Sequence, residues 1–462
     1  MMIPSNMIPS KFVNFFKTTF TGRLISYSNQ SHFDLSTLLK SSGGTFIAKI
    51  LGVGVIFIFQ VILTQILEVE EYGNYVYVIT WVNLLALFAS FGFDITTVHL
   101  VAALIGKKQF ALLHGYLKQS VRISVLVSLG TIFVFTVMLT QIQMWFTTFM
   151  KVLWMVLPLL LATVMLKLYV AQLRGLKCSI SAEVIYTLLR PLITGLGVLT
   201  LFGILGYVAT VKTVLTIELL VIIWLIGVAW YLQRHHIPQE IFSTVPRYET
   251  KYWLKIAFPL LLLSGFASIN SYIDIVIIGW FYENSDIGIY SIVVKIVNLV
   301  SLGLVAVNGI VAPLISELYA KRQLVELKMV VGFAAWGIFV LSVPGLILVL
   351  IFGRELLGIF GVSFVQGYST LIILACGQLV NILTGTCGLI LTMTEYQVIS
   401  SKIMGISALL NLVLNLILVP PYGINGAAFA SATTTILWNI GMLLVALKKL
   451  NINPTIFQII KC

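Results

Sequence analysis

Charged residues are scarce in this sequence. They make up 10% of the 462 residues, whereas 59% are apolar, and an average soluble domain is about 25% charged. A soluble chain of this length needs more polar surface to cover its core, so the excess apolar side chains are expected to face lipid. No polar stretch beyond the first forty residues is long enough to fold as a soluble module. The composition predicts a single membrane domain.

Potential metal ligands and nucleotide-binding motifs are also scarce. The four cysteines are scattered, and among the five histidines only His235 and His236 are adjacent. Neither residue type has metal-ligand spacing, so we expect no metal and no cofactor. The chain lacks the pattern G-x-x-x-x-G-K-[ST], which argues against an ATP-driven pump. Residues 1–40 have no continuous apolar core followed by a small-residue cleavage site, so no cleavable signal peptide is expected.

Long apolar runs, by contrast, recur along the whole chain. A helix needs about 20 apolar residues to cross the hydrocarbon core of a bilayer, and twelve stretches provide them. We therefore expect an all-α integral membrane protein of about twelve transmembrane helices. The predicted spans are 44–67, 75–104, 119–140, 146–173, 180–202, 207–232, 255–281, 287–314, 329–352, 363–392, 398–419 and 424–447.

The two halves of the chain share short motifs. Gly73-Asn74-Tyr75 precedes Val82-Asn83-Leu84, and Gly288-Ile289-Tyr290 precedes Val297-Asn298-Leu299, so the pattern G-x-Y-x6-V-N-L recurs at an offset of 215 residues. Gly203-Ile204-Leu205-Gly206 is echoed by Gly423-Ile424-Asn425-Gly426 at an offset of 220. Both offsets approximate half the chain, which predicts two related six-helix lobes. Since six is even, both lobes insert in the same orientation, with a pseudo-two-fold axis along the membrane normal.

Basic residues fall mainly on one side of the predicted membrane. With a cytoplasmic N-terminus, 21 Lys and Arg residues lie on the cytoplasmic side and three, namely Lys151, Lys212 and Arg354, lie on the other. Cytoplasmic loops carry such an excess, so both termini are expected in the cytoplasm. The formal net charge of +12 is then explained by the basic cytoplasmic loops of a membrane protein, and we expect no nucleic-acid partner.

This topology divides the chain into five segments. They are an N-terminal cytoplasmic or interfacial arm (1–40), an N-lobe with spans one to six (41–232), a cytoplasmic linker (233–254), a C-lobe with spans seven to twelve (255–448) and a cytoplasmic tail (449–462). The arm mixes phenylalanines with Lys and Arg, which is typical of an amphipathic segment on a membrane surface. A partly disordered tail is the alternative.

Several motifs give the chain a family resemblance. The run from Leu39 to Gly52 (LKSSGGTFIAKILG), the segment from Glu71 to Tyr75 (EYGNY) and Phe91-Gly92-Phe93-Asp94 resemble the polysaccharide transporter family. These are the Wzx-type oligosaccharide flippases of the multidrug/oligosaccharidyl-lipid/polysaccharide exporter superfamily. The segment from Pro421 to Ala428 (PYGINGAA) resembles the family's loop before its last helix. The resemblance covers residues 38–448 and implies two six-helix bundles in a V around a cavity that opens alternately to each side.

The resemblance also implies a function. It predicts a transporter and not an enzyme: a flippase that moves polyprenyl-pyrophosphate-linked oligosaccharide repeat units across the bacterial or archaeal cytoplasmic membrane by alternating access, for surface polysaccharide biosynthesis. The expected partners are this substrate, membrane lipids, and a polysaccharide polymerase with its chain-length machinery.

Two alternatives remain open. A multidrug/cation antiporter of the same superfamily shares the fold, but its cationic substrates favour an acidic cavity. An integral membrane glycan ligase or glycosyltransferase handles the same lipid-linked substrates. Such enzymes generally display charged groups on a sizeable extracytoplasmic loop, whereas the outer loops here are short.

Charged side chains inside the spans are the candidate site residues. Each costs roughly 2.5–3.5 kcal/mol at a helix centre, so it faces a wet cavity, forms a pair or reaches the membrane surface. We expect Arg190 and Lys295 to contact the pyrophosphate, for which Arg supplies forked donors and Lys a point charge. Lys49, Asp274 and Asn298 complete the predicted substrate-binding set. The alternative for Lys49 is a role as an anchor whose ammonium reaches the cytoplasmic membrane surface.

Each of three acidic residues inside the spans has two possible roles. Asp274 and Lys295 lie at similar depths on consecutive spans, so they either form a buried ion pair, or Lys295 faces the cavity and Asp274 tunes it. Asp94 and Glu218 are candidates for coupling transport to an ion. The alternative for Asp94 is a structural role at a helix end, and for Glu218 it is packing.

Overall fold

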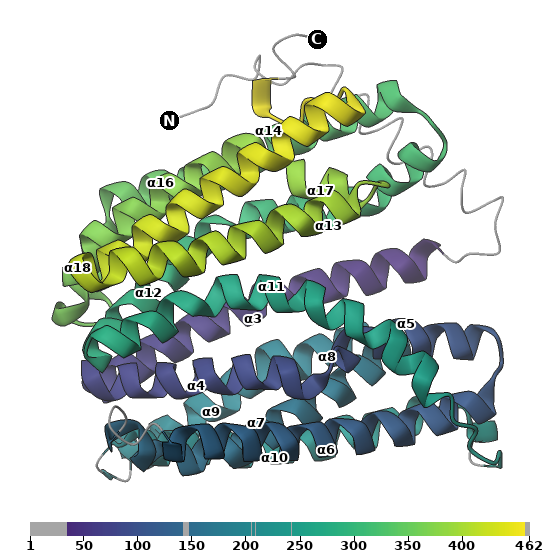
Figure 1. Cartoon of the computed structure of the whole chain (residues 1–462), viewed down its shortest axis with the longest axis horizontal. Helices are drawn as coiled ribbons and strands as arrows, with labels where there is room; N and C mark the ends of the chain where they lie inside the picture. The colour runs from purple at the N-terminus through teal and green to yellow at the C-terminus, as the bar shows by residue number, and fades with distance from the viewer. Residues whose placement is uncertain (1–34, 142–146, 205, 208, 242, 458–462) are drawn as a thin grey trace.

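The chain folds into helices that lie nearly parallel to one another (Figure 1). The computed structural model describes residues 35–141, 147–204, 206–207, 209–241 and 243–457, and within these ranges it contains helices and no strands. Most of the predicted N-terminal arm, at residues 1–34, and the last five residues of the predicted tail lie outside the described part. Helix α3 already begins at Leu35, inside the segment assigned to the arm.

Helices α3 to α10 form the N-lobe. They are α3 (Leu35–Ile66), α4 (Val69–Ser90), α5 (Phe93–Gly106), α6 (Phe110–Gln141), α7 (Thr147–Gly175), α8 (Ser179–Glu183), η2 (Val184–Leu189), α9 (Arg190–Val198), η3 (Leu199–Ile204) and α10 (Val211–His236). A short turn of 3-10 helix, η4 (Gln239–Ile241), follows in the linker.

The remaining helices form the C-lobe. They are α11 (Thr250–Phe281), α12 (Asn284–Val300), α13 (Leu302–Ala320), α14 (Leu324–Ile351), α15 (Gly353–Gly358), η5 (Val362–Gly367), α16 (Tyr368–Thr384), α17 (Cys387–Thr392), α18 (Gln397–Val445) and η6 (Ala446–Leu450).

These helices make the twelve spans predicted from the sequence. In the described part of the chain, ten helices are long and apolar enough to cross a membrane, and α11 is an eleventh with a bend of 49°. Helix α18 supplies two spans, because its backbone leaves the helical region at Gly423 (φ 57°, ψ −136°) after Pro420 and Pro421, and its two limbs run side by side (Figure 1). The expected all-α, two-lobe architecture is confirmed.

The lobes meet at one end of the molecule through the repeated motif. Helix α4 packs against α12, and the two glycines of the motif lie at their crossing. A Cβ on Gly73 would stand 1.6 Å from the carbonyl oxygen of Asn284 and 3.2 Å from the backbone nitrogen of Gly288. Equivalent residues of the two halves thus touch each other, as expected beside a pseudo-two-fold axis.

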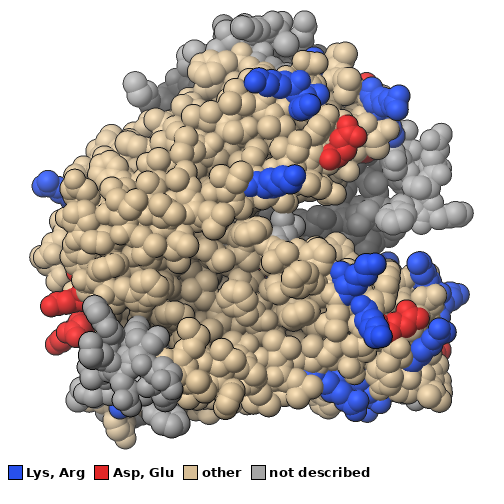
Figure 2. Space-filling view, in the orientation of Figure 1, with Lys and Arg blue, Asp and Glu red and all other residues tan. Residues whose placement is uncertain are grey.

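The other end of the molecule is open between the lobes. Figure 1 shows the C-lobe helices α13, α14, α16 and α18 above and the N-lobe helices below, diverging toward the right. Figure 2 shows the surface hollowed there, with Lys and Arg gathered on the rims of both lobes and acidic residues at the far left. The cleft therefore opens at the basic end.

Candidate functional site

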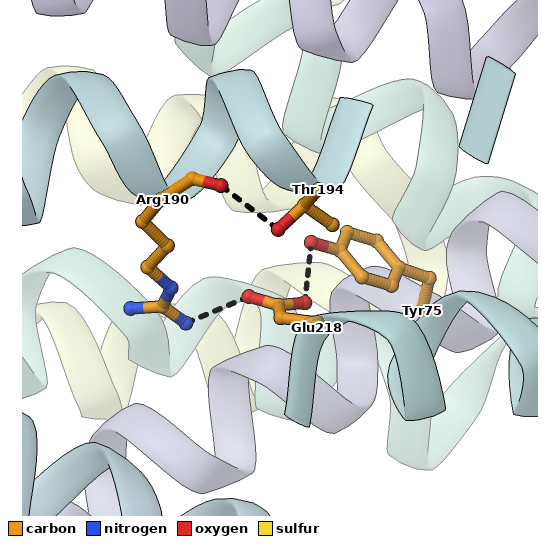
Figure 3. A network of polar contacts seen from close by, with 4 residues as sticks. All are labelled: Tyr75, Arg190, Thr194 and Glu218. Carbon is orange, nitrogen blue, oxygen red and sulfur yellow. Dashed lines mark hydrogen bonds and ion pairs between the residues drawn. The ribbon is translucent and has the colours of Figure 1, made fainter. Parts of the chain in front are cut away.

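Arg190 and Glu218 form an ion pair inside the N-lobe. An Nη of Arg190 donates to Oε1 of Glu218 at 2.7 Å, and the two side chains are 14% and 6% exposed. The hydroxyl of Tyr75 donates to the other carboxylate oxygen at 3.0 Å, as Figure 3 shows. Glu218 is thus held by a neutral and a charged donor from two different helices, which satisfies a carboxylate that burial would otherwise penalise.

The backbone before Arg190 explains how this side chain is placed. Residues Val184–Leu189 form a π-helix, and Pro191 follows Arg190 in the first turn of α9. Proline has no N–H and its ring crowds the carbonyl four residues earlier, so a wider turn relieves the clash. The Thr194 hydroxyl donates to the carbonyl of Arg190 at 2.8 Å and stabilises the start of α9.

The guanidinium of Arg190 has more N–H donors than its contact with Glu218 uses. Its carbon lies 5.8 Å from the ring centroid of Tyr186, and Glu218 is its hydrogen-bonding partner in the described structure. An Arg side chain has five N–H donors in a planar fork, so most of them remain available to a second anion. The geometry suits a phosphate oxygen beside the existing carboxylate.

Further positive charge surrounds this position. The charges of Lys167 and Arg174, on α7, act together with Arg190 on the hydroxyl of Tyr186. Tyr272, on the C-lobe helix α11, is in turn within electrostatic range of Tyr186 and Arg190. Arg174 is itself paired with Glu183 at 3.1 Å. Three basic side chains, Lys167, Arg174 and Arg190, thus act on Tyr186, together with the acidic side chain of Asp94.

Lys295 lies where the two lobes meet. Its ammonium, on α12, donates to Oε1 of Gln60 at 2.6 Å and to the hydroxyl of Tyr72 at 2.8 Å, and it lies 5.4 Å from the Tyr72 ring centroid. Gln60 and Tyr72 belong to α3 and α4, so Lys295 connects the C-lobe to the N-lobe. Its partners are neutral, and no described carboxylate lies within ion-pair distance of it.

Asp274 contacts a different set of partners, all within the C-lobe. Its carboxylate accepts hydrogen bonds from Tyr290 at 2.5 Å, Ser431 at 2.5 Å and Asn415 at 2.8 Å. The ion pair between Asp274 and Lys295 that their depths allowed is therefore not formed. The reason is direction, since Lys295 points to the N-lobe and Asp274 points toward α18.

The other predicted site residues make fewer contacts. Lys49 is exposed near the start of α3. Asn298 is exposed one turn after Lys295, on the same face of α12 because residues i and i+3 are neighbours on a helix. Asp94 is half-buried in the first turn of α5, and its Oδ1 accepts from the N–H of Ile95 at 3.1 Å. A structural role at a helix end is thus what the contacts of Asp94 support.

Sequence reasoning missed the neutral partners that hold these charges. Tyr75 and Tyr290 belong to the repeated motif but had no assigned role, and Tyr72 and Gln60 were not singled out. Asn411 and Asn415 carried a usable signal, because two asparagines four residues apart share one helix face within an otherwise apolar run.

Comparison with known proteins places this arrangement in context. The profile of a family described as polysaccharide biosynthesis protein matches residues 38–319, and the MatE profile matches residues 259–417. A probable low-salt glycan biosynthesis flippase of Haloferax volcanii is 30% identical over 163 residues, 35% of this chain and 34% of that protein. A probable flippase of the same organism is 28% identical over 175 residues, 37% of this chain and 36% of that protein. The chain thus spans about a third of these relatives in the matched regions.

Solved structures share the fold at low sequence identity. An inward-facing multidrug resistance MATE family transporter superposes with a TM-score of 0.68 at 15% identity, covering 86% of this chain and 94% of that one. The lipid II flippase MurJ, in an inward closed conformation, superposes with a TM-score of 0.67 at 14% identity, covering 88% of this chain and 87% of that one. Both likenesses bear on the fold.

Proposed function

Because the chain belongs to the polysaccharide biosynthesis protein family, whose profile matches residues 38–319, we propose that it is a flippase for lipid-linked oligosaccharides. Its substrate would be a polyprenyl-pyrophosphate-linked repeat unit destined for a surface polysaccharide. The main support is the Arg190–Glu218 pair, which leaves guanidinium donors available beside the positive charges of Lys167 and Arg174. One relative named as a glycan biosynthesis flippase, and a second named as a flippase, support this substrate class.

The substrate has one part that cannot cross lipid unaided and one part that can stay in it. The pyrophosphate and glycan are polar, and moving them through about 30 Å of hydrocarbon without partners is prohibitive. A basic interlobe cleft replaces the lost water with Arg and Lys donors, while the polyprenyl chain remains in the bilayer between the lobes. The protein's task is then conformational, and no bond is made or broken.

The closed and open ends support one half of an alternating-access cycle. Contacts between Gly73 and Asn284 and between the side chains of Asn284 and Asn74, at 2.6 Å, hold the lobes together at one end. The open end carries the Lys and Arg residues (Figure 2), which the positive-inside rule assigns to the cytoplasm. The conformation is therefore inward-facing, with both termini in the cytoplasm of a bacterial or archaeal cell.

Arg190 and Lys295 take the anion at different stages in this proposal. Arg190 has donors free while the cleft is open to the cytoplasm. The ammonium of Lys295 is engaged by Gln60 and Tyr72 across the closed end, and these contacts must break when the lobes part there. The headgroup would pass from Arg190 to Lys295 as the outer end opens, with Asn298 one turn further along and Lys49 near the entrance.

Glu218 is the candidate for coupling this step to an ion. When a pyrophosphate engages Arg190, the carboxylate shares its cation with a second anion. A proton or a cation on Glu218 would relieve the excess negative charge. Asp94 is the weaker candidate, since its carboxylate contacts the backbone of its own helix end.

A cation antiporter is the second candidate function, favoured by the MatE profile match over residues 259–417. The two functions differ in the charge of the substrate, and a basic cleft favours the anion. A glycan ligase or glycosyltransferase lacks comparable support, because the family profile and the flippase relatives point to transport. If the substrate is a polysaccharide repeat unit, the flippase would act together with a polymerase and chain-length machinery that use the exported unit.

Reconstitution tests the proposed function directly. The purified chain would be placed in proteoliposomes that contain a fluorescent polyprenyl-pyrophosphate oligosaccharide, and the fraction accessible to an external quencher would be followed in time. We expect acceleration over protein-free vesicles, which Arg190→Gln abolishes and Arg122→Gln, at an exposed arginine of α6, retains. Transport of a lipophilic cation with no movement of the lipid-linked glycan would contradict the proposal and support the antiporter.

A further inference from the structure

A short segment of the C-lobe reaches across the closed end of the cleft and contacts the N-lobe. It comprises α15 and η5, residues 353–367, and connects α14 to α16. We call it the strap. The side-chain amide of Gln65, at the end of α3, donates to the carbonyl oxygen of Ile359 in the strap at 2.8 Å. The strap is therefore hydrogen-bonded to the lobe to which it does not belong.

Two phenylalanines of the strap pack edge-to-face against aromatic rings of the N-lobe. The ring centroids of Phe360 and Phe57, on α3, are 5.2 Å apart, and those of Phe364 and Tyr72, on α4, are 5.9 Å apart. Aromatic rings prefer this arrangement, and both phenylalanines are 1% exposed. Phe57 lies eight residues before Gln65, about 12 Å along α3. The strap thus fills the interface between the lobes with apolar rings over more than two turns of α3.

Both ends of the strap are fixed to the C-lobe. A Cβ on Gly353 would lie 2.8 Å from Cδ2 of Leu371 on α16, and a Cβ on Gly367 would lie 2.7 Å from Cγ2 of Ile289 on α12. Between these close approaches, the side chain of Leu357 is fully buried. Because its ends are packed this tightly, the strap must move together with the C-lobe when the lobes part.

The middle of the strap turns at Gly361. Its backbone has φ 130° and ψ 156°, a conformation that residues with a Cβ rarely adopt. The turn lies between Phe360 and Phe364, which are both buried, whereas Val362 in between is 89% exposed. The strap therefore presents its two phenylalanines to the lobe interface and turns the intervening side chain outward.

The strap shares one partner with Lys295. The ring of Tyr72 packs against Phe364, while the hydroxyl of Tyr72 accepts a hydrogen bond from Lys295 at 2.8 Å. An anion that takes the ammonium of Lys295 removes this bond and frees Tyr72 to turn. Phe364 then loses a fixed neighbour in the N-lobe. Binding of an anion at Lys295 would in this way loosen the strap.

We propose that the strap, residues 353–367, is a lid of the C-lobe that closes the cleft against the N-lobe through Phe360, Phe364 and the carbonyl of Ile359. A polar headgroup cannot leave past these apolar rings, because they offer it no hydrogen bonds. The lid therefore separates from α3 and α4 before the headgroup is released. The cargo of the lid is that of the proposed function, whereas its movement follows from the contacts between the lobes alone.

The movement of the lid can be measured without any substrate. In a full-length chain with its four native cysteines replaced by alanine, spin labels would be attached to Ser363→Cys in the strap and to Lys212→Cys at the start of α10, both exposed. Pulsed electron paramagnetic resonance then gives the distances between the labels. We expect Phe360→Ala to raise the ratio of long to short distances about threefold to tenfold, and Gln65→Ala to raise it less. Val362→Ala, on the exposed side of the strap, is the matched control and should leave the ratio unchanged. Because Gln65 is exposed, Gln65→Ala covers the case in which Phe360→Ala does not fold. An unchanged ratio in every folded variant of Phe360 and Gln65 would overturn the proposal.

Cross-linking tests whether transport needs the lid to open. In the same cysteine-free background, Gln65→Cys and Ile359→Cys would be joined by a short, reducible bis-methanethiosulfonate reagent in proteoliposomes. We expect flipping to slow about tenfold or more and to recover when dithiothreitol releases the link. The pair Ser363→Cys and Gln366→Cys, both exposed within the strap, is the control and should keep transport when linked. Undiminished flipping by the linked Gln65–Ile359 pair would overturn the lid. A chain that flips no glycan even before linking contradicts the proposed function instead, and the spin-label distances then decide the lid.

Discussion

Lys295 and Tyr72 join the two lobes at the closed end of the cleft. The ammonium of Lys295, on α12, donates to the Tyr72 hydroxyl at 2.8 Å and lies over its ring. Lys295 is about two helix turns beyond Gly288, and Tyr72 directly precedes Gly73, so the contact lies close to the crossing of α4 and α12. The contact is a hydrogen bond and a cation–π interaction between a C-lobe lysine and an N-lobe tyrosine. It makes the closure of this end dependent on side chains that a passing anion can compete for.

Loss of the Lys295 contacts should weaken the closed end. Lys295→Met keeps the length of the side chain but removes its three donors, so Gln60 and Tyr72 lose their shared partner. We expect cysteines placed at this end to react with an impermeant maleimide at least several times faster in intact cells. Lys402→Met, which changes a lysine at the basic end, is the control. Equal labelling in wild type and Lys295→Met would contradict a bridging role.

The crossing of α4 and α12 should not tolerate a side chain at Gly73. A Cβ there would lie 1.6 Å from the Asn284 carbonyl, so Gly73→Ala must separate the helices. We expect transport to fall tenfold or more while membrane abundance stays within about twofold. Gly130→Ala is the matched control, since nothing lies within 4 Å of its Cβ and alanine favours a helix. Normal transport by Gly73→Ala would show that the lobes do not need this close approach.

Breaking the Arg190–Glu218 pair should cost stability as well as function. Removing one partner of a buried pair leaves the other charge unpaired, at a cost of about 3–5 kcal/mol, whereas replacing both by apolar residues is far less harmful. Arg190→Met should therefore lower the melting temperature more than the double variant Arg190→Met/Glu218→Leu. Identical melting of the single and double variants would mean that the two charges are not coupled.

Exchange of charges distinguishes the two acidic sites. Asp274 and Lys295 have separate partners, so Asp274→Lys/Lys295→Asp should be as inactive as either single variant in a complementation assay. Arg190→Glu/Glu218→Arg should instead recover part of the function or abundance lost in its single variants. Recovery by the first exchange would restore the ion pair that their similar depth suggested.

The sequence was sufficient for the helices but not for the partners of the charges. Twelve apolar runs and a repeat at 215 residues predict the spans and lobes, because the bilayer dictates helix length and gene duplication leaves matching motifs. The repeat also marks Gly73 and Gly288, which the structure places in contact. A motif shared by both halves cannot reveal whether its residues pack, hydrogen-bond or bind, and these two glycines do the first.

The charged residues show where sequence reasoning ends. The position of Arg190 inside an apolar span predicts a site residue, but its pairing with Glu218 depends on the direction of each side chain around its helix, and a π-helix directly before Arg190 changes that direction. Likewise, equal depth on consecutive spans suggested that Asp274 meets Lys295. Depth fixes one coordinate and leaves the angle around the helix axis open, and that angle directs the two side chains to different lobes.

The account rests on an anionic headgroup that binds at Arg190. The direct measurement is the affinity of the purified protein for a polyprenyl-pyrophosphate oligosaccharide, compared between wild type, Arg190→Lys, Arg190→Gln and the exposed-arginine control Arg122→Gln. We predict a loss of tenfold or more for Arg190→Gln, a smaller loss for Arg190→Lys, which keeps the charge but not the fork, and little change for Arg122→Gln. Equal affinity of wild type and Arg190→Gln would contradict it.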